Sequence, residues 1–132
     1  MIVVDTSAMF AIAAHEVDRD IFIGILDRTD AAICSAVTYL ETVMVLTGRS
    51  HAVARSRVDE LLRAFAIGVA SIDRPITDAA IDAFDRYGKG RHRAALNLAD
   101  CFSYALAKTR NAQLLFKGDD FPRTDIEAAF RS

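Results

Sequence analysis

The chain has 132 residues, of which 52% are hydrophobic and 26% are charged, and its formal net charge at pH 7 is −2. This length suits a single domain over residues 1–132 with its own hydrophobic core, and the composition excludes an intrinsically disordered chain. The slightly acidic balance argues against a broad basic surface for nucleic acid, so any contact with RNA must come from a local patch.

Neither a secretory signal nor a membrane span is expected. The first residues lack a basic stretch followed by a long apolar one, and no apolar run approaches ~18 residues. Cys34 and Cys101 lie far apart among apolar residues and fit no zinc or redox spacing, so they are predicted to be reduced core residues. We therefore expect a cytoplasmic protein that makes no contact with a membrane.

The first half of the chain alternates short buried strands with helices. A β-branched run at residues 2–4 ends at Asp-Thr-Ser, which is typical of a strand that leads into a helix, and a short helix is expected up to residue 13. Residues 17–28 place their apolar side chains on one helical stripe. Residues 31–35 are predicted to be a second buried strand, and residues 37–49 a helix.

The second half continues this alternation. Strands separated by helical stretches, with no two-residue hairpin signal, indicate parallel pairing through crossovers. The sequence therefore predicts a three-layer α/β/α sandwich around a short, mostly parallel sheet. The remaining predicted elements are a helix over 52–66, a strand at 68–72, a helix capped by Thr77 to about residue 87, a helix capped by Asn97 to about residue 110, a strand at 113–116 and a last short helix over about 125–130.

Acidic residues follow two of the predicted strands. Asp5 comes directly after the first strand, and Asp119 and Asp120 follow the fourth. Ligands in open parallel sheets bind beyond the carboxyl ends of the strands, so these acids are expected to share one edge of the sheet. Strand-end position slightly favours Asp119 over its neighbour.

Two further acids, Glu41 and Asp100, admit two interpretations each. Thr38 and Glu41 match a capping box, in which Glu41 would only bind the backbone at the helix start. Asp100 follows Asn97 by three residues, where an acid stabilises the helix dipole. Their apolar surroundings favour a site, because Asp100 is the only charge within residues 94–107 and a buried carboxylate needs a strong partner.

A divalent cation is the partner that would satisfy several carboxylates together. Oxygen ligands without histidine or cysteine favour Mg²⁺, with Mn²⁺ as a substitute, over zinc. Mg²⁺ keeps several waters and binds one or two carboxylates together with phosphate oxygens, which suits hydrolysis of a phosphodiester by a metal-activated water. A surplus acid can hold a second ion or act as the general base.

Four segments, in this order and spacing, carry a family resemblance that spans nearly the whole chain: IVVDTSA (2–8), CSAVTYLE (34–41), ALNLADCFSYALA (95–107) and LLFKGDDF (114–121). In these segments the chain resembles the PIN-domain nucleases, and among them the VapC toxins of bacterial toxin–antitoxin pairs. The resemblance implies a magnesium-dependent endoribonuclease that is held inactive by a cognate VapB-type antitoxin. It also implies a homodimer and a toxin–antitoxin hetero-oligomer.

The resemblance further implies roles for particular residues. Asp5, Glu41 and Asp100 are expected to bind metal or act in catalysis. The fourth acid is Asp119 or Asp120, because family members differ over which position of this loop carries it. Of the two, Asp119 is the one predicted to bind metal, and both are kept as catalytic acids. Four supporting residues are expected: Thr6 or Ser7 is expected to form hydrogen bonds near the metal, and Asn97 and Ser103 are expected to support the site.

A basic stretch at residues 86–93 holds four Lys or Arg residues, a Tyr and a His, and its two glycines are expected to make it mobile. Lys89, Arg91 and Arg93 are predicted to contact RNA phosphates, which would supply binding energy and little sequence reading. Tyr87 is predicted to stack on an unpaired base. The alternative is a loop that is merely solvated.

Two other classes of protein compete with the nuclease. Haloacid phosphatases and receiver domains also place an Asp after a strand and use Mg²⁺. The phosphatase signature needs a second Asp two positions after Asp5, where Ser7 stands, and Cys34-Ser35 supplies no receiver-type acceptor. The other alternative is a non-catalytic dimerising scaffold, which a nuclease assay with Mg²⁺, Mn²⁺ or EDTA would distinguish.

Overall fold

A four-stranded sheet crosses the middle of the computed structural model, which describes residues 1–49 and 53–130. Its strands are β1 (Ile2–Val4), β2 (Ala32–Ser35), β3 (Ile67–Ala70) and β4 (Gln113–Leu115), in the order β3-β2-β1-β4. Every pairing is parallel, with Val3 opposite both Ile33 and Leu114. His51 and the first residue of the helix predicted over 52–66 lie outside the described residues.

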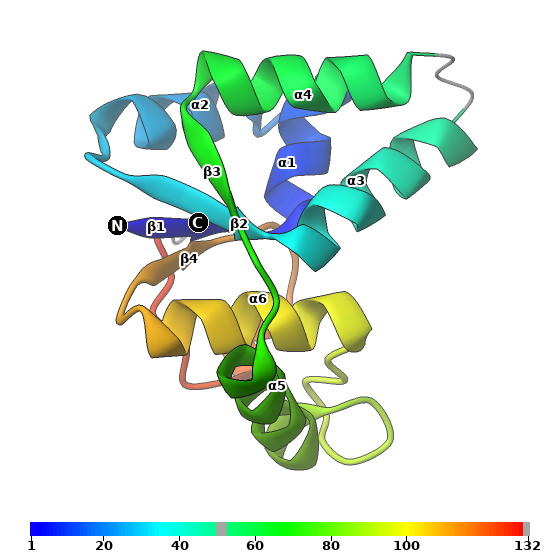
Figure 1. Ribbon diagram of the computed structural model, residues 1–132, viewed down its shortest axis with the longest axis vertical. Helices are drawn as coiled ribbons and strands as arrows, with labels where there is room; N and C mark the ends of the chain where they lie inside the picture. The colour runs from blue at the N-terminus through cyan, green and yellow to red at the C-terminus, as the bar shows by residue number, and fades with distance from the viewer. Residues whose placement is uncertain (50–52, 131–132) are drawn as a thin grey trace.

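Helices cover both faces of the sheet (Figure 1). Strand alternation builds one core on each face, because Ile2 and Val4 point into one apolar cluster and Val3 into the other. The predicted three-layer α/β/α sandwich is therefore confirmed. One layer contains α1 (Thr6–Ala13), α2 (Arg19–Arg28), α3 (Ala36–Gly48) and α4 (Ala54–Ala64), and the other contains α5 (Arg74–Tyr87) and α6 (Leu98–Thr109).

The predicted start of α5 is wrong. The N-cap is Asp73, whose side chain accepts a hydrogen bond from the backbone N–H of Ile76 at 3.0 Å. Thr77, the predicted cap, lies inside the helix and donates its hydroxyl to the carbonyl of Asp73 at 2.8 Å. Pro75 belongs to the first turn, where the missing N–H of a proline has no helical partner to lose.

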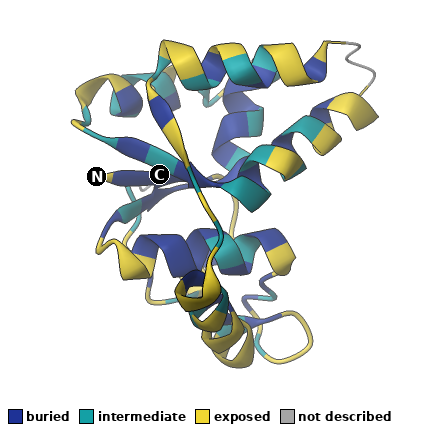
Figure 2. Cartoon of the chain, viewed as in Figure 1, coloured by how far each residue is buried: buried dark blue, intermediate teal, exposed yellow. Residues whose placement is uncertain are grey.

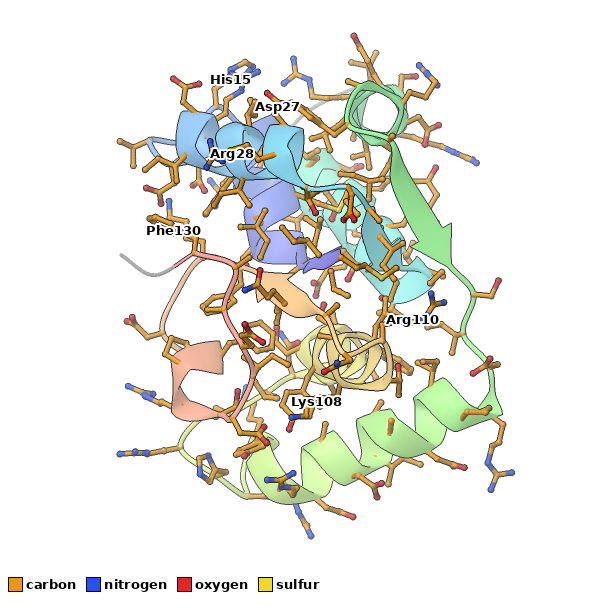
Figure 3. All side chains as sticks on the ribbon, turned by 90° about the vertical axis from the view of Figure 1, so that its left-hand side faces the viewer. His15, Asp27, Arg28, Lys108, Arg110 and Phe130 are labelled. Atoms are coloured by element: carbon orange, nitrogen blue, oxygen red, sulfur yellow. The ribbon has the colours of Figure 1, made fainter. Side chains whose placement is uncertain are left out.

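The short helix predicted over residues 125–130 is also wrong. After a 3₁₀ turn, η1 (Phe121–Arg123), the chain runs extended beside β4, and the N–H of Leu114 donates to the carbonyl of Glu127 at 2.9 Å. A six-residue helix cannot offset the cost of helix nucleation, whereas the sheet edge supplies backbone partners. Phe130 ends beside α2 (Figure 3), where its ring meets the ring of Phe22 edge to face at a centroid distance of 6.2 Å.

Burial follows the layers, with β1, β2, β4 and the inner helix faces largely buried, and with the outer helix faces and much of the edge strand β3 exposed (Figure 2). Cys34 and Cys101 are buried and unbonded, as predicted. Within the described part of the chain, every helix is too short or too polar to cross a bilayer.

Candidate functional site

Asp5 lies where β1 ends and α1 begins, and it is the N-cap of that helix. Its side chain is only 3% exposed. Oδ2 accepts hydrogen bonds from the backbone N–H of Ser7 at 3.0 Å and from the Ser7 hydroxyl at 2.7 Å, and Oδ1 accepts one from the Ser103 hydroxyl at 2.7 Å. These three bonds fix the orientation of the carboxylate, and each oxygen offers about two lone-pair positions.

Asp100 has the capping role that the sequence allowed. It closes a capping box at the start of α6, accepting the N–H of Asn97 at 3.0 Å while its own N–H donates to the Asn97 side-chain oxygen at 2.9 Å. Burial raises the pKa of Asp100 to about 7, against the opposing effect of the Asn97 N–H. The charges of Asp5, Glu41 and Asp120 raise that pKa further, so these three acids and Asp100 together form a cluster of four.

Glu41 is not a capping residue, and the capping-box interpretation of Thr38 and Glu41 is wrong. The N-cap of α3 is Ser35, whose hydroxyl accepts the backbone N–H of Thr38 at 3.0 Å. Glu41 therefore lies in the second turn, half-buried, and within residues 1–49 and 53–130 no hydrogen bond or ion pair engages its carboxylate. Its charge is among those that act on Asp100.

The two acids of the loop after β4 differ in their surroundings. Asp120 is among the charges that raise the pKa of Asp100, and Asp119 is not. Asp119 instead lines a groove on another flank, together with Asp18 and Phe130. The effect of its charge on Asp100 therefore favours Asp120 as the fourth acid, against the slight preference for Asp119 that strand-end position suggested.

The acids are gathered but not tightly packed. Among the described residues, no three His, Cys, Asp or Glu side chains are close enough to hold one ion by themselves. The donor set contains carboxylate oxygens and no His or Cys, which suits Mg²⁺, an ion that keeps several waters and takes one or two carboxylates with phosphate oxygens, better than zinc, which prefers N and S ligands. The residues that can serve as oxygen donors are Asp5, Glu41, Asp100 and Asp120.

Basic residues on α6 lie far from these acids. Lys108 and Arg110 are at the C-terminal end of the helix (Figure 3), whereas Asp100 is in its first turn. Lys108 pairs instead with Asp125 at 3.2 Å. His15 lies in the layer of α1 and α2 (Figure 3), so it is not part of the acidic cluster.

The predicted supporting residues differ in the hydrogen bonds that their side chains form. Ser7 bonds Asp5 and also accepts the backbone N–H of Lys117 at 2.9 Å, which ties the loop carrying the fourth acid to the end of β1. Asn97 and Ser103 bond Asp100 and Asp5 directly. The hydroxyl of Thr6 is buried and has no hydrogen-bond partner among the described residues.

Two residues of the basic stretch have structural partners. Tyr87 is half-buried, with its ring 5.1 Å from the His92 ring and 5.6 Å from the Tyr104 ring, so it does not present a free face for a base. Arg91 pairs with Asp85 at 3.4 Å. These contacts argue against the predicted stacking by Tyr87 and weaken the predicted phosphate contact of Arg91.

Lys89 and Arg93 remain exposed in this stretch, and no ion pair is recorded for them in the described part of the chain. The base of the loop is closed by backbone hydrogen bonds from Lys89 to Leu96 at 2.9 Å and from Leu96 to Tyr87 at 3.0 Å. Gly88 serves packing more than mobility, because a Cβ there would lie 2.3 Å from a ring carbon of Phe84.

Sequence reasoning missed two buried hydroxyl residues, Ser35 and Thr38. The Ser35 hydroxyl donates to the Thr38 hydroxyl at 3.3 Å, and the Thr38 hydroxyl lies 3.2 Å from that of Ser103. The only available signal was the presence of small hydroxyl side chains beside apolar ones at the start of a predicted helix.

Comparison with known proteins agrees with this geometry. The sequence model of the family described as "PIN domain" matches residues 2–127. A protein of Mycolicibacterium smegmatis named Ribonuclease VapC is 42% identical over 126 residues, covering 96% of this chain and 98% of the relative. Ribonuclease VapC30 of Mycobacterium tuberculosis is 41% identical over 124 residues, covering 94% and 95%.

Solved structures give the same fold. The chain aligns with VapC20 of Mycobacterium tuberculosis, described as a Sarcin-Ricin loop cleaving toxin, at a TM-score of 0.75 and 19% identity, covering 97% of this chain and 98% of that one. It also aligns with a toxin–antitoxin complex from Klebsiella pneumoniae at a TM-score of 0.74 and 13% identity, covering all of both chains.

Proposed function

This chain belongs to the PIN-domain family, and on that premise we propose that it is a Mg²⁺-dependent endoribonuclease, the toxin of a VapBC-type toxin–antitoxin pair. The resemblance noted from the sequence is confirmed by the family match and by relatives named as VapC ribonucleases over nearly their full lengths. The observation that carries the proposed chemistry is the gathering of Asp5, Glu41 and Asp120 around the half-buried Asp100.

The proposed mechanism assigns separate tasks to the residues of the cluster. When bound, Mg²⁺ acidifies a water and neutralises the charge that develops on the phosphate. Asp5, held by Ser7 and Ser103, presents the remaining lone pair of Oδ1 in a fixed orientation that needs no reorganisation during the reaction. Asn97 orients Asp100 in the same way. The residues that would hold the ion come from the set Asp5, Glu41, Asp100 and Asp120, and a carboxylate of this set that did not coordinate it would be available as the general base.

RNA is the proposed substrate, and Lys89 and Arg93 are the side chains best placed to meet its phosphates outside the acidic cluster. Exchange of both for alanine is expected to weaken RNA binding and to flatten its dependence on salt, since each phosphate contact releases counterions. Arg91→Ala is the matched comparison, because that arginine already pairs with Asp85. Equal effects of the two changes would reject this assignment.

A homodimer and a complex with a VapB-type antitoxin are part of the proposal. Exposed apolar side chains lie on the two helices that carry Glu41 and Asp100: Leu40 is 60% exposed, Met44 62% and Leu98 74%. Large apolar groups in contact with water are typical of surfaces that a protein partner covers. Because the proposed substrate is cellular RNA, the proposed location is the cytoplasm.

The test is RNA cleavage by the purified protein with Mg²⁺, with Mn²⁺ and with EDTA. Cleavage is expected only with a metal ion, and Asp100→Asn is expected to abolish it. Asp20→Asn is the control, since the Asp20 side chain is 95% exposed and lies on α2. Metal-independent RNA degradation that persists in Asp100→Asn would reject the proposed function, and intact RNA under every condition would support a non-catalytic scaffold.

A further inference from the structure

A chain of buried hydroxyl groups leads from the start of α3 to Asp5. The Ser35 hydroxyl contacts the Thr38 hydroxyl at 3.3 Å, the Thr38 hydroxyl contacts the Ser103 hydroxyl at 3.2 Å, and the Ser103 hydroxyl contacts Asp5 Oδ1 at 2.7 Å. None of these four side chains is more than 3% exposed. Water therefore has almost no access to these side chains, and their hydrogen bonds must be satisfied within the protein.

The direction of donation in this chain follows from the number of hydrogens. A carboxylate oxygen only accepts, so the single hydroxyl hydrogen of Ser103 is committed to Asp5. Ser103 must then accept from Thr38, and Thr38, having used its hydrogen, accepts from Ser35. All three hydroxyls consequently donate toward Asp5, and each polarises the next. At the far end, the Ser35 hydroxyl accepts the backbone N–H of Thr38.

The series of buried hydroxyl groups connects the three elements that carry the central acids. Thr38 precedes Glu41 by one helical turn on α3, and Ser103 follows Asp100 by one turn on α6. The contact between Thr38 and Ser103 thus crosses between those helices, and Ser103 extends it to the end of β1. Thr38 is the middle link, and without its hydrogen the hydroxyl of Ser103 keeps its bond to Asp5 but accepts no hydrogen bond in return.

We propose that Thr38 is a positioning residue for the cation-holding carboxylate of Asp5, acting through the directed bond that it makes to Ser103. This inference rests on the proposed function, because it assumes that Asp5 holds a divalent cation. Loss of the Thr38 hydroxyl leaves Ser103 without its donor and without the polarisation that strengthens the bond from Ser103 to Asp5 Oδ1, so this oxygen is held less firmly than Oδ2, which Ser7 still binds. The consequence is weaker cation binding with the protein still folded.

The test compares three variants on α3. Thr38→Val removes the hydroxyl and keeps the shape, and Thr38→Ser keeps the hydroxyl. Thr42→Val is the matched control, since Thr42 is equally buried on the same helix but its hydroxyl donates only to the backbone carbonyl of Thr38, at 2.8 Å. Mn²⁺ affinity is measured without RNA by electron paramagnetic resonance, and RNA cleavage is then followed as Mg²⁺ is raised. Circular dichroism confirms the fold.

Thr38→Val is expected to weaken Mn²⁺ binding by about tenfold, the lower end of what loss of an outer hydrogen-bond partner costs a metal site, and to raise the Mg²⁺ needed for cleavage by the same factor. Thr38→Ser and Thr42→Val are expected to stay close to wild type. If Thr38→Val fails to fold, Thr38→Ala removes the same hydroxyl without the added methyl group and carries the same expectation.

Wild-type affinity in Thr38→Val, or an equal loss in Thr42→Val, would overturn the positioning role while leaving the proposed function intact. A wild-type protein that binds no Mn²⁺ and cleaves no RNA with any metal ion would overturn both, so the two failures are distinguishable.

Discussion

Asp100→Asn is expected to stabilise the metal-free protein at neutral pH, although it removes the proposed activity. The folded-state pKa of Asp100, about 7, lies above its unfolded value, so the folded protein holds the proton more tightly. The contribution of Asp100 is therefore most favourable below about pH 4, and it is lost progressively as the pH rises from about 4 to about 7.

The size of this effect follows from the shift in pKa. The rise from 3.8 to about 7 is roughly 3 units, and at about 1.4 kcal/mol per unit the upper limit is about 4 kcal/mol. Asp100 is only half-buried, and solvent screening reduces the expected cost to about 1–2 kcal/mol at pH 8. Asparagine cannot titrate, yet its side-chain carbonyl still accepts the capping N–H of Asn97.

The assay is urea unfolding in EDTA at pH 5 and at pH 8, for wild type, Asp100→Asn and the exposed control Asp20→Asn. The free energy of unfolding of Asp100→Asn should exceed that of wild type by about 1–2 kcal/mol at pH 8, and this gain should shrink at pH 5. Added Mg²⁺ should remove the advantage at pH 8. A gain that is the same at both pH values, or that Asp20→Asn shares, would refute the reasoning that burial, together with the neighbouring acids, raises the pKa of Asp100.

Three further predictions concern single side chains. Ser103→Ala removes a buried hydrogen bond to a carboxylate and should lower the free energy of unfolding by about 2 kcal/mol in urea titrations, a loss that a solvent-filled or relaxed site would not show. Gly88→Ala places a methyl group 2.3 Å from the ring one turn earlier and should cost at least about 2 kcal/mol, whereas Gly48→Ala, with open space around it, should not destabilise. Asp120→Asn should reduce RNA cleavage at least about 100-fold and Asp119→Asn less than about fivefold, and the reverse order would restore Asp119 as the fourth acid.

The order of layers could be predicted because the spacing of apolar residues differs clearly between the strands and the helices of this sequence. Short β-branched runs such as residues 2–4 are separated by amphipathic stretches, and parallel crossovers follow from that alternation. The misplaced elements depended on tertiary partners. The tail over residues 125–130 has the composition of a helix, but the edge of β4 offers it backbone hydrogen bonds that a short isolated helix could not match.

The location of a candidate site residue could be predicted where its position follows from the backbone alone. The placement of Asp5 at a strand end needs only the strand itself, and Asp100 needs only the capping signal of Asn97. The choice between Asp119 and Asp120 depends on how one loop turns, which strand-end reasoning does not resolve. The link from Thr38 to Ser103 joins positions 65 residues apart, so no local pattern can reveal it.

Asp100 shows how a single residue can serve the fold and the site at once. Its backbone and side chain complete the start of α6, and the N–H of Asn97 together with the positive end of the helix opposes the cost of burying the charge. Asp5, Glu41 and Asp120 add to that cost, so the metal-free cluster is held together by the fold against its own repulsion. A bound cation removes the repulsion without disturbing the cap, because Asn97 bonds only Oδ2 of the carboxylate. Cation binding should therefore raise stability and complete the proposed active site in the same step.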